Sequence, residues 1–294
     1  MGKNSVRVGG VPEHFNTPWY LLSEEKPLLK DNIDVDFVPC YGGTGEMATA
    51  LRNNELDIAV LLTEGITANI LKGDDVSIVK IYVNSPLRWG IHVSRTSDIL
   101  KDDEFEGHKF AISRPYSGSH LMAYVHAQKH NVELKDEDFV VIKNIDGARK
   151  SLANGESHYF LWEKFTTQPY VDNGEFRCVG ECPTPWPCFV VAVRNEFLNE
   201  NETVVAKILD EINRIVADLE ADRENTIDEI SRRFELKREQ VADWFSQLNW
   251  NKDFELPQDV FHEVETTLHN LGVLKDADLR DKPAYLRSLA AVSI

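Results

Sequence analysis

The 294-residue chain is strongly acidic: 32 Lys and Arg residues against 49 Asp and Glu residues give a formal net charge of −17. This excess argues against nucleic acids and anionic membrane surfaces as main partners, because both attract basic proteins. The composition, 42% hydrophobic and 28% charged, is ordinary for a globular protein, and the length suffices for two domains. No apolar run approaches the roughly 20 residues that a membrane-spanning helix needs, so we expect no membrane insertion.

The first residues pass directly into a strand-like segment at Val6, Arg7 and Val8, without the apolar stretch of a secretion signal. We therefore expect a cytoplasmic protein. The alternative is a secreted protein from which the signal has been removed.

Four cysteines are too few for a disulfide framework in a chain of this size. Cys178, Cys182 and Cys188 form a Cys-x3-Cys-x5-Cys cluster, but this cluster has no Cys-x2-Cys pair and no nearby histidine, as a zinc site usually does. We expect buried thiols, with no metal site and no cofactor.

Residues 36–73 indicate a strand, a tight turn, a helix and a second strand. Met47 and Leu51 recur at helical spacing after the turn, which contains Gly42, Gly43 and Gly45. The run at 56–62 is apolar on both faces, which is typical of a parallel strand covered by helices. Thr44 is expected to cap the helix, and the glycines would let a ligand approach the backbone N–H groups.

The same pattern extends along the chain. A strand at 6–11 precedes a short helix, with Thr17 and Pro18 as its cap and first-turn residues. Further strands are expected at 76–83, 87–93, 109–112, 139–142, 157–162, 176–179 and 189–193. Further helices are expected at 64–72, 121–130, 146–154, 165–171, 201–219, 227–234, 238–248 and 257–271.

The strand at 109–112 begins a second copy of the pattern. The apolar strand at 189–193 is expected to return to the first domain. We therefore predict one domain from residues 1–95 and 189–294, including the C-terminal helices, and a second from 96–188, with two linkers acting as a hinge.

Several motifs together resemble the type II periplasmic-binding-protein fold, in particular its sulfonate, nitrate, taurine and thiamine-precursor binding group. They are residues 42–46, 54–59 leading to 63–65, 107–111 and the helical tail 231–249. The resemblance implies an α/β protein of two lobes, each with a mostly parallel sheet flanked by helices, joined by two hinge crossovers and followed by a helical C-terminal segment. It also implies a small molecule held in the cleft between lobes that close over it.

The resemblance also implies which positions contact the ligand. The first-lobe contacts would be His14, Phe15, Asn16, Gly43, Thr44, Thr63, Glu64 and Trp89. The second-lobe contacts would be Ser113, Tyr116, Ser117, Gly118, Trp162, Glu163, Pro185 and Trp186.

Aromatic side chains at these positions would stack on a flat or apolar ligand. Glu64 and Glu163, facing it from opposite lobes, would favour a cation or a hydrogen-bond donor such as an amine or a heterocycle. Arg88 and Arg114 would favour an acidic ligand if they point inward. The residues alone leave both classes open.

We expect a protein that binds a small-molecule metabolite of heterocyclic, amine or thiamine-precursor type. One alternative is an enzyme of thiamine or pyrimidine-precursor metabolism on the same fold. It is less expected, because Leu61 and Gly65 occupy the positions where the fungal pyrimidine synthases of this fold carry Lys and His. Catalysis is therefore left open, and no catalytic residue is assigned.

Another alternative is the substrate-binding subunit of an ABC transporter with its signal removed. Without that signal, a transporter partner is not expected. The oligomeric state is left open.

Overall fold

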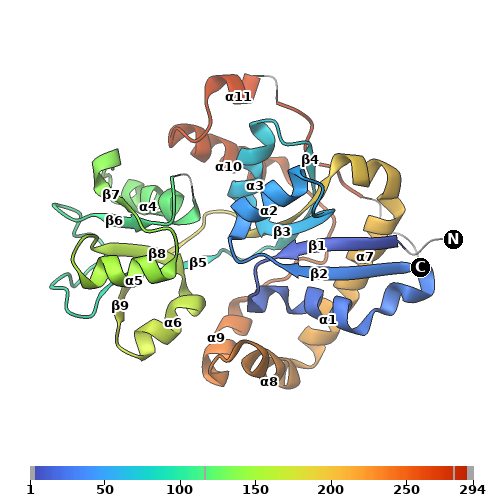
Figure 1. The fold of residues 1–294 in the computed structure, drawn as a ribbon, viewed down its shortest axis with the longest axis horizontal. Helices are drawn as coiled ribbons and strands as arrows, with labels where there is room; N and C mark the ends of the chain where they lie inside the picture. Colours follow the sequence, from blue (N-terminus) through green and yellow to red (C-terminus); the bar gives the residue numbers. More distant parts are fainter. Residues whose placement is uncertain (1–3, 116, 281, 290–294) are drawn as a thin grey trace. The chain divides into compact units, whose positions relative to one another are not determined.

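Two five-stranded sheets organise the chain in the computed structural model, which describes residues 4–115, 117–280 and 282–289. Each sheet belongs to its own unit (Figure 1). The first unit is formed by Met1–Ser85 and Trp186–Ile294, and the second by Pro86–Pro185. The second unit is thus inserted into the sequence of the first.

The sheet of the first unit has the strand order β2-β1-β3-β10-β4. Its strands are β1 (Asn4–Gly10), β2 (Ile33–Pro39), β3 (Ile58–Leu62), β4 (Val76–Val83) and β10 (Phe189–Arg194). β1 is parallel to β2 and β3, whereas β10 is antiparallel to β3 and β4. The carboxyl ends of β1 to β4 and the start of β10 therefore share one edge, which we call the first carboxyl edge.

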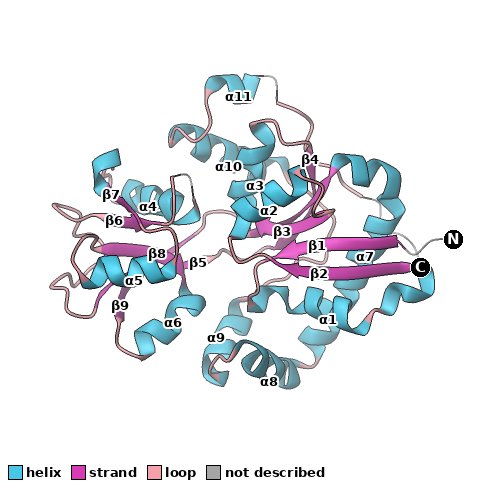
Figure 2. Cartoon of the chain, in the orientation of Figure 1, coloured by secondary structure: helices cyan, strands magenta, loops and turns pink. Residues whose placement is uncertain are grey.

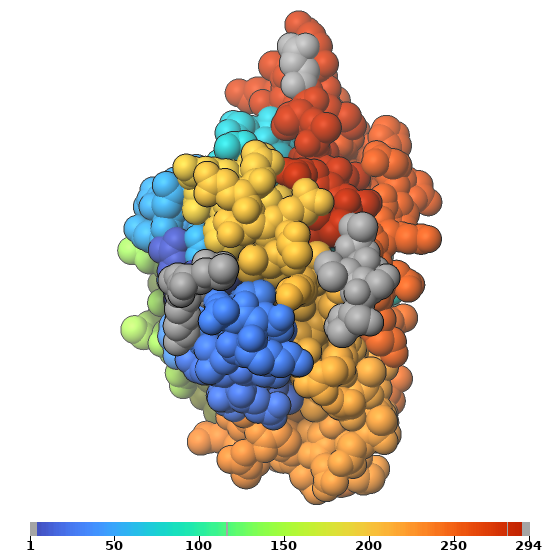
Figure 3. Space-filling model, turned by 90° about the vertical axis from the view of Figure 1, so that its right-hand side faces the viewer, coloured from blue at the N-terminus to red at the C-terminus, as the bar shows by residue number. Residues whose placement is uncertain are grey.

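Helices cover this sheet (Figure 2), as expected for strands such as β4 that are buried along their whole length. The helices of this unit are η1 (His14–Asn16), α1 (Thr17–Glu25), η2 (Pro27–Asp31), α2 (Gly43–Arg52), α3 (Thr63–Leu71), α7 (Asn195–Ala221), α8 (Arg223–Phe234), α9 (Arg238–Gln247), α10 (Gln258–Asn270) and α11 (Asp276–Arg280). α7 is interrupted by non-helical backbone at Asn201. Figure 3 shows α7 (yellow) beside the blue N-terminal segment, where Lys207 pairs with Asp31 at 2.8 Å.

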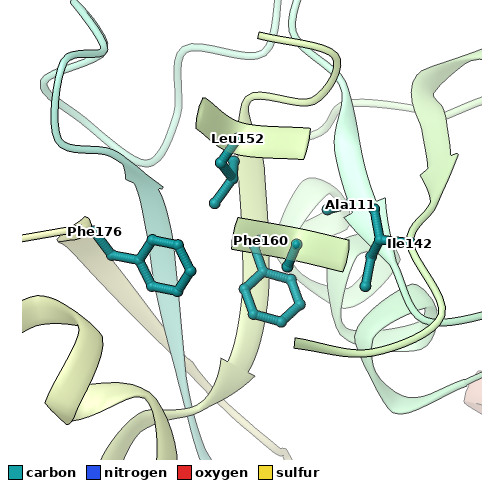
Figure 4. Packing of buried hydrophobic residues seen from close by; sticks show 6 residues of the cluster. Ala111, Ile142, Leu152, Phe160 and Phe176 are labelled. Carbon is teal, nitrogen blue, oxygen red and sulfur yellow. The ribbon is translucent and has the colours of Figure 1, made fainter. Parts of the chain in front are cut away.

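The sheet of the second unit has the order β7-β6-β8-β5-β9. Its strands are β5 (Arg88–Ser94), β6 (Phe110–Ile112), β7 (Phe139–Val141), β8 (Tyr159–Glu163) and β9 (Phe176–Pro183), and its helices are α4 (Gly118–Lys129), η3 (Asp136–Asp138), α5 (Ile145–Ala153) and α6 (Lys164–Asp172). Ala111, Ile142, Leu152, Phe160 and Phe176 are buried together in its core (Figure 4).

The predicted fold class is confirmed: each unit has a mixed, mostly parallel sheet flanked by helices, and the C-terminal segment is helical. The strand predicted at 189–193 does return to the first sheet, as β10. Each helix of the described segments is too short or too polar to cross a membrane.

The strand predicted at 87–93 exists as β5, but its assignment to the first domain is wrong. Trp89 in β5 pairs with Glu163 of β8 and with Cys182 of β9. The chain passes between the units at Ser85 and Pro86, and again at Pro185 and Trp186, rather than near residues 95 and 188. The physical reason is that an apolar run predicts a buried strand without specifying which sheet it joins.

Candidate functional site

The first carboxyl edge gathers most of the residues predicted for the first lobe. Gly10, at the end of β1, lies opposite both Pro39 of β2 and Val60 of β3. The segments that follow these strands contain His14 to Asn16, Gly43 and Thr44, and Thr63 and Glu64. Parallel strands thus bring three distant stretches of sequence to one edge, where ligands of α/β sheets typically bind.

Trp186 also lies in the first unit, and its assignment to the second domain is corrected here. Its indole Nε1 donates a hydrogen bond to Glu64 Oε2 over 2.9 Å. Both side chains are buried, each 2% exposed. The segment of Trp186 is attached to the start of α3, because Thr63 donates from its backbone N to Cys188 O (3.1 Å) and from Oγ1 to Pro187 O (2.6 Å).

Glu64 has the electrostatic character of a binding group. Its second carboxyl oxygen, Oε1, is buried and has no hydrogen-bond partner among the residues that the structure describes. Burial raises the pKa of Glu64 to about 7, although the interaction with its own backbone N–H group and the hydrogen bond from Trp186 oppose this shift. Near neutral pH the carboxyl group therefore populates both protonation states.

Thr44 joins the first turn of α2 to the end of β3 instead of capping the helix, so the predicted cap is wrong. Its Oγ1 accepts a hydrogen bond from Leu62 N at 3.3 Å. The N-cap position is Gly42, whose N–H donates to the Glu46 carboxylate. A Cβ atom on Gly65 would lie 2.6 Å from Thr44 Cγ2. A glycine is therefore needed where α2 and α3 begin side by side.

The backbone of η1 is anchored on β4 and on the segment after α9. Phe15 O accepts hydrogen bonds from Tyr82 Oη at 2.7 Å and from Trp250 Nε1 at 3.2 Å. Asn16 Nδ2 donates to Val11 O at 2.8 Å, which fixes the orientation of the amide. Asn16 Oδ1 is buried and, within the described part of the chain, has no hydrogen-bond partner.

The two ring side chains before Asn16 pack into an aromatic cluster. The Phe15 ring lies 5.1 Å from Phe189 and 5.2 Å from Trp244, and the His14 ring lies 4.4 Å from Trp244, measured between ring centroids. Burial lowers the pKa of His14 to about 3, so its imidazole is neutral at physiological pH.

The residues predicted for the second lobe lie at the corresponding edge of the second sheet, where buried serines precede and begin α4. Ser119 Oγ accepts a hydrogen bond from Ser113 N at 3.0 Å and lies 3.1 Å from Ser117 Oγ. Gly118 is the first residue of α4. Tyr116 lies outside the described residues.

Glu163 has a different role from Glu64, because both of its oxygens cap α6. Glu163 Oε1 accepts a hydrogen bond from Phe165 N at 3.1 Å. Glu163 Oε2 accepts hydrogen bonds from Thr166 N and Oγ1, both at 2.7 Å. Burial raises the pKa of this carboxyl group. The hydrogen bonds that the Glu163 carboxylate accepts from Phe165 and Thr166 thus lie at the start of α6.

The tryptophans of this unit pack on its sheet. Trp89 and Trp162 make an edge-to-face contact with 6.5 Å between ring centroids, and Trp162 stacks on Phe160 at 5.3 Å. Trp89 lies in the second unit, which corrects its assignment to the first domain. Trp89 Nε1 is buried without a hydrogen-bond partner among the described residues.

The remaining residues considered for the second lobe are Arg88, Arg114 and Pro185. The Arg88 guanidinium pairs with Glu181 at 2.7 Å, so its charge is compensated within the unit. Arg114 and Pro185 are exposed.

One aromatic side chain at the first carboxyl edge was missed. Tyr41, in the turn after β2, is 84% exposed. A large aromatic side chain exposed beside a glycine-rich turn is a ready stacking surface. In the sequence, the position of Tyr41 directly before the glycine-rich turn indicates an exposed side chain. The residue type alone does not distinguish an exposed tyrosine from a buried one.

Comparisons with known proteins agree with this architecture. Residues 89–182 match a protein-family model described as Ca3427-like PBP. The Candida albicans CA3427 gene product, described as defining a new family with the generic periplasmic binding protein fold, has a similar structure (27% identity, TM-score 0.88, 98% of this chain and 97% of that chain covered).

Two more distant structures share the fold. They are the alkanesulfonate-binding protein SsuA from Xanthomonas axonopodis pv. citri bound to MOPS (14% identity, TM-score 0.81, coverage 98% and 99%) and PhnD1 from Prochlorococcus marinus in complex with methylphosphonate (13% identity, TM-score 0.60, coverage 93% and 100%). No curated protein matches the sequence.

Proposed function

The chain is a protein of the periplasmic-binding-protein fold, and on this premise we propose that it binds a small-molecule metabolite at the first carboxyl edge. The proposal is supported by two structures of the same fold, SsuA bound to MOPS and PhnD1 in complex with methylphosphonate. Its finer part concerns the chemistry of the ligand: a heterocyclic or amine-containing molecule, of the kind that includes thiamine precursors, which donates hydrogen bonds to this edge.

The unpartnered Oε1 atom of Glu64 carries the proposal. A buried acceptor without a partner costs about 1–3 kcal/mol, so a ligand N–H group that reaches this oxygen recovers that free energy. Asn16 Oδ1 is a second buried acceptor without a hydrogen-bond partner among the described residues. It lies on the segment that follows β1, the strand next to β3. Two acceptors at one edge favour a ligand with hydrogen-bond donors.

The charge of Glu64 favours the same ligand class. An oxyanion placed against an ionised carboxylate would be repelled, whereas an ammonium group or a heterocyclic N–H would be attracted. While Glu64 is ionised, a sulfonate or phosphonate is therefore disfavoured at this position, although molecules with such groups are bound by the structural relatives named above.

A thermal-shift screen tests the proposal. The panel contains amines and pyrimidine or thiazole heterocycles beside matched sulfonates and phosphonates. A ligand at about 100 times its Kd should stabilise the protein by about 2.7 kcal/mol. Stabilisation by sulfonates or phosphonates alone would contradict the ligand class.

Calorimetry on hits then compares the wild type with Glu64→Gln, which keeps the side-chain shape but removes its charge. Loss of a charge-assisted hydrogen bond should weaken binding by about tenfold or more. Glu55→Gln, an exposed carboxylate before β3, is the control. Equal affinity of the wild type and Glu64→Gln would place the ligand elsewhere.

Three further expectations accompany this function. Ligand recovered unchanged from the denatured protein distinguishes a binding protein from an enzyme. Small-angle scattering with and without ligand tests the hinge closure that the sequence resemblance implies. Cell fractionation tests the cytoplasmic location.

A further inference from the structure

Two histidines and an aspartate of the second unit form a cluster apart from the residues discussed above. His126 and His130 are four residues apart at the end of α4, so they share one helix face. Asp102 belongs to the segment between β5 and β6. One potential ligand atom from each residue lies within 4.8 Å of the other two. His126 Nε2 is 4.0 Å from Asp102 Oδ2 and 2.6 Å from Asp102 O.

We propose that Asp102, His126 and His130 bind a divalent transition-metal ion of the Zn²⁺ class, with water completing the coordination. Two imidazole nitrogens and a carboxylate oxygen are ligands that Zn²⁺ accepts, and three protein ligands leave a position open for water. Two histidines spaced by four residues on a helix can each present one ring nitrogen to the same ion.

The separations require only a small rearrangement. Ligand atoms around a tetrahedral ion with bonds of about 2.0–2.2 Å lie about 3.3–3.6 Å apart, so the cluster must contract by about 1 Å. His126 is 2% exposed, and its Nε2 donates a hydrogen bond to Asp102 O, so coordination through Nε2 would replace this hydrogen bond and release its proton. His130 is exposed and the Asp102 side chain is 30% exposed, so these two can rotate toward an ion.

The local charges also favour a cation. The carboxyl end of a helix carries partial negative charge, and α4 ends at Lys129 with His130 in the C-cap position. Lys129 directs its ammonium group to Cys182 Sγ, at 3.6 Å.

The position of the cluster indicates a stabilising role. α4 begins at Gly118, after the carboxyl end of β6, and ends at Lys129, 11 residues further along the chain. A metal ion here would tie the segment between Ser94 and Phe110, which contains Asp102, to the end of α4. The bound ion would stabilise the second unit without contacting the serines at the start of α4.

Titration calorimetry of the full chain with Zn²⁺ tests the site, with Co²⁺ absorption spectra as a second readout. The variants His130→Ala and Asp102→Asn alter exposed or half-exposed side chains, and circular dichroism verifies that each folds. The matched control is His158→Ala, which removes one ring of the His108–His158 pair (5.0 Å between centroids).

We expect one-to-one binding by the wild type and by His158→Ala, with affinity lower by about tenfold or more in His130→Ala and Asp102→Asn. Zn²⁺ should raise the Tm of the wild type and leave that of His130→Ala unchanged. The proposal is overturned if the wild type binds no stoichiometric Zn²⁺, or if His130→Ala binds it as tightly as the wild type.

Discussion

The indole Nε1 of Trp186 donates a hydrogen bond to Glu64 Oε2 across 122 positions of sequence, and the other oxygen of that carboxyl group has no partner among the described residues. The bond joins the first turn of α3 to the segment before β10, on both sides of the inserted second unit. It holds the carboxyl group in place, so that its second oxygen is presented at a fixed position.

Removing the indole donor should weaken both stability and ligand binding. Trp186→Phe keeps an aromatic ring but leaves Glu64 Oε2 without its donor, at a cost of about 1–3 kcal/mol in the free energy of unfolding. Urea denaturation measures this cost. Trp162→Phe, at a half-buried indole stacked on Phe160, is the control and should cost less. Equal losses of unfolding free energy in the two variants would show that the hydrogen bond from Trp186 to Glu64 makes no measurable contribution to stability.

The ionisation of Glu64 should make stability depend on pH. Its pKa is about 7 in the folded protein against 4.5 for the unperturbed group, so the folded state binds more protons than the unfolded state between these values. The free energy of unfolding contributed by this group therefore falls as the pH rises from about 4.5 to about 7, by roughly 3 kcal/mol.

Urea midpoints measured across this pH range, in the wild type and in Glu64→Gln, isolate this contribution. As the pH rises, the wild type should lose stability relative to Glu64→Gln. A difference that stays constant with pH would mean that Glu64 titrates normally.

A methyl group at Gly65 should push α2 and α3 apart. The new Cβ atom in Gly65→Ala would lie 2.6 Å from Thr44 Cγ2, and overpacking of this kind costs about 1–3 kcal/mol. Thr44→Ser removes Cγ2 while keeping the Oγ1 atom that accepts from Leu62 N. The double variant should therefore be less destabilised than the sum of the single variants. Additive effects in this double-mutant cycle would refute the steric explanation.

Glu163 should matter for the second unit rather than for the ligand. Glu163→Ala removes the acceptor for the N–H groups of Phe165 and Thr166, which should cost about 0.5–2 kcal/mol of stability. Ligand affinity measured by calorimetry should stay close to that of the wild type. A large loss of affinity with little loss of stability would instead support the sequence-based prediction that Glu163 contacts the ligand.

The sequence predicts the elements well because their signals are local. The apolar runs at β4 and β10 and the helical spacing of Met47 and Leu51 each determine an element without reference to the rest of the chain. Sheet membership is not local. Trp89 and Trp186 were therefore exchanged between the domains, since each lies within a few residues of a crossing point.

The metal-binding proposal shows a second limit of sequence patterns. The sequence spacing typical of metal ligands is that of Cys178, Cys182 and Cys188, whereas His126 and His130 lie elsewhere. Their third partner, Asp102, is 24 residues upstream of His126 and meets it only after β6 and α4 have folded. The hydrogen bond from Trp186 to Glu64 is equally invisible until the sheet of the first unit is assembled.

The place of β10 in the strand order has a consequence for biosynthesis. β10 lies between β3 and β4, yet it is synthesised only after the entire second unit. The nascent chain therefore holds an incomplete first sheet while residues 86–185 can already fold. We expect proteolysis of stalled ribosomal complexes to detect a protected second unit first, with protection of β3 and β4 following only once Arg194 has emerged.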